Sequence, residues 1–280
     1  MASPNLSEII TTTLRNRSKS LADNVTNHNA LLRRLSENGN ISTVTGRQIV
    51  RELEYASNGT VGFYTGYETL DVSPSDVLTS ATFDYKQMAG NVTISGLEQI
   101  QNSGTEAIIN LLESRIGVLE KTMANTLSTS LYSDGTGSDG KEVGGLQLLV
   151  ADAGTGTVGG INSSTFTFFQ NVQTTATSSA FSTTNIQSDM NTIYLSLVRG
   201  SDSPDLIMAD TNAYKSFLGS LQAIQRVTSD RVATSGFTSV QYLNSDVIFD
   251  DACPANKMYF LNTDYLRLEV AANRNFVPGE

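Results

Sequence analysis

Several residue types are scarce in this chain, and each scarcity excludes a class of protein. The 280 residues include no tryptophan, one cysteine and one histidine, and only 16% are charged. Because Cys253 is alone, no intrachain disulfide can form, and a reducing compartment is the simplest inference. A zinc site would have only Cys253, His28 and carboxylates, with no ligand cluster at metal-binding spacing. We therefore expect no metal.

Basic residues and long apolar runs are also lacking. The 18 Lys and Arg residues are outnumbered by 28 Asp and Glu residues, which gives a net charge of −10. An acidic chain does not bind phosphate backbones by bulk attraction, although it can still enclose nucleic acid. No stretch approaches the 18 apolar residues of a spanning helix, and the first five residues show no signal-peptide pattern. We expect no membrane partner.

Catalytic constellations are missing as well. A hydrolytic triad would have to use His28, yet the sequence has no Gly-x-Ser-x-Gly motif. The closest carboxylate pairs are Asp250 with Asp251 and Glu52 with Glu54. Glu52 and Glu54 share one face of a predicted strand, which indicates a solvated or intersubunit face rather than an acid/base pair.

The tract at residues 154–159 (GTGTVG) matches the dinucleotide-binding pattern literally. That mechanism needs a helix to begin at the last glycine, so that its N-terminus meets the pyrophosphate. The sequence that follows, GINSST, is a poor helix start. The tract is therefore interpreted as a flexible loop, and no cofactor is expected.

Residues 82–132 carry the strongest pattern in the chain. Residues 82–94 have strand chemistry, residues 95–104 form a short polar joint, and residues 105–132 read as one long helix. Ser103 and Glu106 fit a capping box at its start. Apolar residues then recur at spacings of three and four: Ile108, Ile109, Leu112, Ile116, Leu119, Met123, Leu127 and Leu131. Such a helix spans roughly 40 Å.

A long two-stranded excursion is predicted at residues 47–94. Its strands are expected at 48–56 and 82–94, with Tyr64 and Tyr67 near the tip between Gly62 and Gly66. Isolated hairpins are marginally stable in water. This one needs a surface to lie on, and a neighbouring copy is a candidate.

The N-terminal residues 5–38 read as helix, ended by Gly39 in a left-handed cap. The moderate apolar stripe and the basic residues Arg15 and Arg33 are typical of an arm lying on a partner surface. An ordinary first helix of the domain explains the same pattern equally well.

The rest of the chain inserts helices among strands. A Gly/Ser/Thr-rich zone at 133–181 contains one predicted strand at 146–150. Further strands are predicted at 206–208, 237–249 and 257–270, and helices at 184–198 and from the Asp210 cap to about 224. The order is α+β, without a βαβ rhythm or an internal repeat.

In order and pattern these segments resemble the tailed-bacteriophage major capsid proteins of the Hong Kong 97 type. The sequence FDYKQMAGNVTIS at 83–95 resembles the return strand of the family's extended loop, and residues 98–131 resemble its joint and spine helix. LIMAD at 206–210 with residues 214–218 resembles the strand and helix of the axial domain, and MYFLNT at 258–263 with residues 265–266 resembles a late core strand. The resemblance covers roughly residues 40–270 and contains no single diagnostic motif.

The resemblance implies an α+β Hong Kong 97-type capsid fold. Its parts would be an N-terminal arm at 1–46, an extended β-hairpin loop at 47–94, a spine helix and peripheral domain at 95–145, a mainly axial domain at 146–250, and a return to the peripheral core sheet at 251–280. The protein would be a structural subunit, not an enzyme.

Partners and location also follow from the resemblance. Copies would self-assemble as hexamers and pentamers into an icosahedral shell that encloses double-stranded DNA without sequence-specific binding. Separate scaffolding, portal and decoration proteins are compatible partners. The location would be the virion, assembled in the host cytoplasm. Candidate intersubunit contacts are Arg15, Arg33, Arg51, Glu52, Glu54, Tyr64, Tyr67, Phe83, Tyr85 and Lys86.

Two alternatives remain open at this point. One is an encapsulin-like compartment shell, which shares the fold but encloses protein cargo, and the other is a soluble enzyme that uses the Gly-rich loop. Some family members crosslink a loop lysine to an asparagine of a neighbour. Because Lys86 lies on a predicted strand away from the tip, that chemistry is not carried over. The family usually continues with further strands beyond the segment that ends here.

Overall fold

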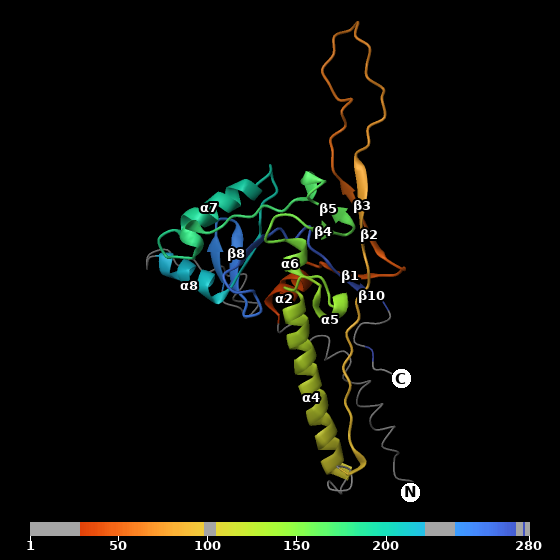
Figure 1. Ribbon diagram of the computed structural model, residues 1–280, viewed down its shortest axis with the longest axis vertical. Coiled ribbons are helices and arrows are strands. Elements are labelled where there is room, and N and C mark those ends of the chain that lie inside the picture. Colours follow the sequence, from red (N-terminus) through yellow and green to blue (C-terminus); the bar gives the residue numbers. More distant parts are fainter. Residues whose placement is uncertain (1–28, 98–104, 222–238, 273–276, 278–280) are drawn as a thin grey trace.

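The structure, a computed structural model, describes residues 29–97, 105–221, 239–272 and 277. Figure 1 shows a body of helices and strands from which two long elements extend in opposite directions. One is the loop that continues strands β2 (Ile49–Glu54) and β3 (Leu78–Phe83), and the other is helix α4 (Thr105–Ser130). Mixed helix and strand content confirms the predicted α+β class.

The body is organised on a four-stranded sheet with the order β7-β8-β6-β9. Strand β6 runs parallel to β8 and antiparallel to β9, and β7 is antiparallel to β8. All four residues of β6 are buried, as expected for the predicted apolar strand. The sheet strands are β6 (Leu206–Ala209), β7 (Ser239–Tyr242), β8 (Ser245–Phe249) and β9 (Met258–Leu261).

Two cores lie on the two faces of this sheet, because successive strand residues point to opposite sides. Leu206 and Met208 belong to a core shared with α2 (Ala30–Glu37) and the end of α4. Ile207 belongs to the other, formed with α7 (Ile186–Leu197) and α8 (Thr211–Ser220). The side chain of Asp210 accepts a 2.8 Å hydrogen bond from the Ala213 N–H, which confirms the predicted cap of α8.

Helix α2 (Ala30–Glu37) is the described part of the predicted N-terminal helix, and Asn29 caps it. Gly39 takes a φ of +71°, as its predicted left-handed role requires. Ala30, Leu31, Leu32 and Leu35 are buried in the core, so this stretch packs as an ordinary domain helix. Strand β1 (Ile41–Val44) follows and pairs in parallel with β10 (Leu268–Ala271).

Helix α4 (Thr105–Ser130) confirms the predicted long helix. Its end packs into the core through Leu131 and Tyr132, while most of its length extends beyond the sheet (Figure 1). The Tyr132 hydroxyl donates a 2.8 Å hydrogen bond to the Asp250 carboxylate, which joins the helix end to the segment after β8. The predicted capping box lies outside the described residues.

The loop strands are β2 (Ile49–Glu54) and β3 (Leu78–Phe83), an antiparallel pair. The prediction that the second strand spans 82–94 is therefore wrong except at its first two residues. Residues 84–95 have no ladder partner within the described part of the chain. Apolar residues do alternate in this segment. The register of strand pairing, however, is fixed by packing against residues far away in the sequence, which the local pattern does not indicate.

Other segments also differ from prediction. Residues 146–150 contain the short helix α6 (Leu146–Leu149) rather than a strand. The two late strand regions each hold two short strands instead of one long one. The remaining short elements are α5 (Gly137–Gly140), β4 (Thr157–Val158), β5 (Ile161–Asn162), η1 (Thr167–Phe169) and η2 (Thr177–Ser179).

Candidate assembly interface

The tip of the loop, residues 56–76, exposes large apolar side chains. Phe63 and Tyr67 are fully exposed, and their neighbours are also open to solvent: Val61, Tyr64, Leu70 and Val72. Exposed apolar surface of this kind is typical of a contact site for a partner. Sequence reasoning identified Tyr64 and Tyr67 but missed the others, because they lie among Gly, Thr and Ser without a regular period.

Charge on the loop has one sign. Residues 52–85 contain six carboxylates and no Lys or Arg: Glu52, Glu54, Glu68, Asp71, Asp76 and Asp84. A surface that receives this loop must tolerate or complement negative charge.

Strands β2 and β3 have one exposed and one covered face. The exposed face, called the outward face below, carries Val50, Glu52 and Glu54 opposite Thr82, Ser80 and Leu78. Val50 and Leu78 are 55% and 58% exposed. The structure thus confirms that Glu52 and Glu54 share a face and adds two apolar residues to it.

The covered face is fixed to the body. Ala81 is buried against Gly159, where an added Cβ would lie 2.6 Å from the Cβ of Ala81. The Thr82 N–H donates a 2.9 Å hydrogen bond to the Gly159 carbonyl. The ring of Tyr55 stacks on Phe168 with 5.1 Å between centroids. The base of the loop is therefore held in place while its tip stands free.

A charged contact also anchors this base. The guanidinium of Arg51 forms an ion pair with Glu269 on β10, whose side chain is nearly buried. Arg51 is one of the predicted intersubunit contacts, and here it binds its own chain.

The segment after β3 runs back along α4 (Figure 1). At Gly90 an added Cβ would lie 2.4 Å from a methyl of Leu119, so a larger residue would not fit without displacing that side chain. Arg115 of α4 donates a hydrogen bond to the Thr93 carbonyl. Residues 84–95 therefore contact their own long helix, where the sequence predicted a surface for another subunit.

The remaining predicted contacts also lie against their own chain or outside the described part. Phe83 packs near Gly159, and Tyr85 is half-buried. Lys86 donates a hydrogen bond to the Gly140 carbonyl. Arg33 forms an ion pair of 3.2 Å with Glu37 on the same helix. Arg15 lies outside the described residues.

The glycine-rich tract does not form a nucleotide site. Strands β4 and β5 make a small antiparallel hairpin, and Gly159 and Gly160 form its turn with φ of +56° and +80°. A strand follows the last glycine of the pattern, so no helix N-terminus is aimed at a phosphate. The tract serves as packing for β3.

The candidate nucleophile Cys253 and the candidate metal ligands do not form a reactive site in the described residues. Burial raises the pKa of the Cys253 thiol to about 12, with a smaller effect from nearby Asp210 and Asp250. The thiol is protonated at neutral pH and is a poor nucleophile. Within the described residues no group of three or more His, Cys, Asp or Glu side chains could hold a metal ion, and no helix could cross a membrane. His28 lies outside those residues.

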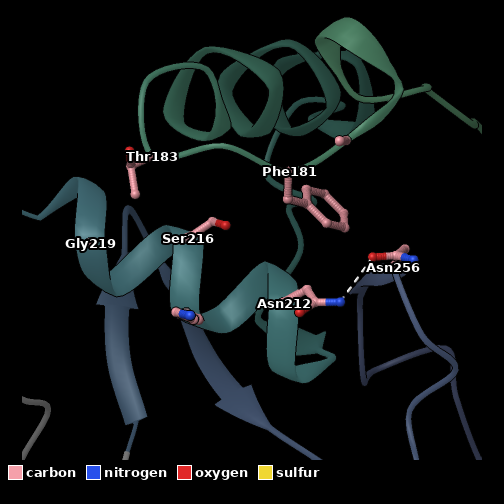
Figure 2. Close-up of a pocket in the computed structure, with 8 residues that line it drawn as sticks. Phe181, Thr183, Asn212, Ser216, Gly219 and Asn256 are labelled. Carbon is pink, nitrogen blue, oxygen red and sulfur yellow. Dashed lines mark hydrogen bonds between the residues drawn. The ribbon is translucent and has the colours of Figure 1, made fainter.

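A shallow groove of about 440 Å³ lies beside α8 (Figure 2). Phe181 forms one wall, and Asn212 donates a 3.1 Å hydrogen bond to Asn256 at one end. Lys215 is the one charged residue among those that line it. The groove lacks the converging acid, base and nucleophile of a catalytic site.

Comparison with known proteins gives a match among solved structures. No protein-family model matches the chain, and no curated protein matches it in sequence. Among solved structures, it is similar to a chain of the cyanophage A-1(L) capsid asymmetric unit, with a TM-score of 0.60 and 19% sequence identity. The match covers 82% of this chain and 70% of that one. The chain therefore has the fold of a phage capsid protein.

Proposed function

We propose that this chain is the structural subunit of an icosahedral phage capsid of the Hong Kong 97 type. The observation that carries the proposal is the fold shared with a cyanophage capsid chain over 82% of the sequence. In this proposal hexamers and pentamers of the chain close into a shell around double-stranded DNA. The body containing β6–β9, α7 and α8 is the axial domain, and α4 is the spine helix.

The loop supports this role. Its base is fixed to the body by Gly159, Phe168 and Glu269, whereas its tip exposes Phe63 and Tyr67 completely. Removing such side chains from water favours association. The loop therefore lies over a neighbouring copy, with its apolar tip and its acidic outward face as the contacts.

The candidate contacts divide into two groups in this proposal. Glu52, Glu54, Tyr64 and Tyr67 lie at the intersubunit interface. Arg51, Phe83 and Lys86 hold the loop and its return segment in position through the contacts they make within their own chain.

The net charge of the chain agrees with a shell protein that encloses DNA rather than with a protein that binds DNA. A net charge of −10 gives no bulk attraction for phosphate, which agrees with DNA that is enclosed but not held by the bulk charge of the shell. The protein acts in the virion after assembly in the host cytoplasm, and scaffolding, portal and decoration proteins are its further partners. No catalytic step is assigned to it.

Electron microscopy of the purified, concentrated protein tests the proposal. We expect closed shells, or rings of five and six subunits, and nuclease-protected DNA in particles purified from infected cells. Particles that contain protein cargo and no DNA would indicate an encapsulin-like compartment instead. A strictly monomeric species, with or without a scaffold, would contradict both shell functions.

A further inference from the structure

The outward face of β2–β3 carries two carboxylates that have no partner among the described residues. Within the described residues, neither Glu52 nor Glu54 has an ion pair or a hydrogen bond from a side chain. By contrast, Glu68 and Asp71 accept hydrogen bonds from backbone N–H groups of their own turns. Glu52 and Glu54 are therefore free to meet a cation supplied from elsewhere, together with the exposed Val50 and Leu78.

In a shell of identical copies, the surface that receives this face must lie on the same chain. That receiving surface should carry no Asp or Glu side chain, should be partly apolar, and should be accessible from outside the subunit. Figure 1 shows the loop and α4 extending from the body in opposite directions, so the outward face of one chain meets α4 only in a second copy.

Helix α4 offers such a surface. Exposed residues recur at three- and four-residue spacing and share one side of the helix, called the α4 stripe below: Ser114, Val118, Lys121, Thr122, Asn125 and Thr129. The stripe contains no carboxylate, because helical spacing places Glu113 and Glu120 on the opposite side. Lys121 is its one charge, and it has no ion pair within the described residues.

The two threonine hydroxyls of the stripe are occupied. The hydroxyls of Thr122 and Thr129 donate to carbonyls of their own helix, at 2.8 Å to Val118 and 3.1 Å to Asn125. The threonines therefore need no further hydrogen-bond acceptor from a partner. Together with Val118, which is 65% exposed, they make a surface that apolar side chains can cover at low cost.

The two surfaces also match in length. Six residues of β2 extend about 20 Å, and the fifteen-residue rise from Ser114 to Thr129 is about 22 Å. The end of α7 also combines exposed apolar residues with a cation, at Leu195, Val198 and Arg199, but this patch covers little more than one helical turn. It serves as the matched alternative.

We propose that the outward face of β2–β3 docks on the α4 stripe of a second copy, with Glu52 and Glu54 beside Lys121. Val50 and Leu78 then cover Val118. This inference rests on the proposed function, since it specifies which surface of a neighbour receives the loop.

Charge reversal in the full-length protein tests the pairing. Lys121→Glu and Glu52→Lys are each expected to lower the yield of sedimenting particles about tenfold, because each places like charges together. Combining the two substitutions should restore the yield to within about threefold of the wild type. Glu54→Lys replaces Glu52→Lys in a second cycle. The thermal unfolding midpoint of the soluble subunit should stay unchanged in every variant, which separates assembly from folding.

Arg199→Glu is the matched control, since it reverses another exposed cation, which lies just after the end of α7. It should leave the particle yield near the wild-type value. The docking inference is wrong if Lys121→Glu assembles normally, if neither Glu52→Lys nor Glu54→Lys restores its yield, or if Arg199→Glu is the variant that a loop reversal rescues. The proposed function would survive each of these results, whereas a wild-type protein that forms no particles would remove both.

Discussion

Gly159 lies directly against Ala81, so close that a Cβ at position 159 would stand 2.6 Å from the Cβ of Ala81. This contact ties the β4–β5 turn to the covered face of the loop. It explains why the base of the loop is fixed although the tip has no support from the described body.

Replacing Gly159 by alanine should destabilise the subunit by about 1–3 kcal/mol, since the new methyl overlaps Ala81 and Phe83. Chemical unfolding measures this cost. Gly200→Ala is the control for backbone strain, because Gly200 has a similar φ of +62° but nothing within 4 Å of an added Cβ. Equal costs at the two positions would mean that packing at the loop base contributes nothing.

The exposed tip should matter for assembly and not for folding. The double substitution Phe63→Ser with Tyr67→Ser removes two fully exposed rings, so the unfolding free energy should change by less than about 0.5 kcal/mol. Particle yield, measured by sedimentation, should fall sharply because the buried apolar area of the interface is lost. Leu195→Ser, at an exposed position on α7, should assemble normally. Normal yield from the double variant would remove the tip from the interface.

The two sides of α4 should respond differently to truncation. Ile116 is only 4% exposed, so Ile116→Ala should cost about 2–4 kcal/mol of subunit stability. Val118 is mostly exposed, and Val118→Ala should cost less than about 0.5 kcal/mol. Denaturant titration of the soluble subunits provides both values. Similar costs would show that the helix does not pack on its own chain as described.

Alkaline pH should destabilise the subunit through Cys253. Burial raises the pKa of its thiol to about 12, against an ordinary value of about 8.5. Below the ordinary value the thiol is protonated in both states and its stability contribution is complete. Above it, only the unfolded chain loses the proton, so stability falls by up to about 1.4 kcal/mol per pH unit.

The window from pH 8.5 to 10 isolates this effect, because tyrosines of the unfolded chain ionise mainly above about 10. Cys253→Ala should flatten the pH dependence of the unfolding free energy in that window, whatever its effect on absolute stability. An unchanged slope would mean that the thiol is more accessible than its buried position indicates.

Local patterns predicted the elements whose determinants are local. The spacing of apolar residues up to Leu131 gave α4, the run at 206–208 gave β6, and Asp210 gave the cap of α8. Each depends on residues within one or two turns of each other, or on a continuous buried run.

The predictions were wrong where packing between residues far apart in the sequence decides the structure. Residues 83–89 alternate like a strand, yet β2 pairs with residues 78–83, in the register that places Ala81 on Gly159. The apolar run at 146–149 fits a strand or a helix equally. In the structure it is a helix, and the N–H of Leu146 donates a 2.7 Å hydrogen bond to the Leu131 carbonyl. Exposure of Phe63 or Val118 depends on what the fold leaves uncovered, which no local pattern records.

The most direct test of the central claim is a cryo-electron microscopy map of the assembled particle at side-chain detail. The account predicts a closed shell in which Phe63 and Tyr67 of each copy are buried against a neighbouring copy, while Ala81 remains packed on Gly159 of its own chain. A shell in which the tips extend freely into solvent, or a protein that stays monomeric at high concentration, would contradict it.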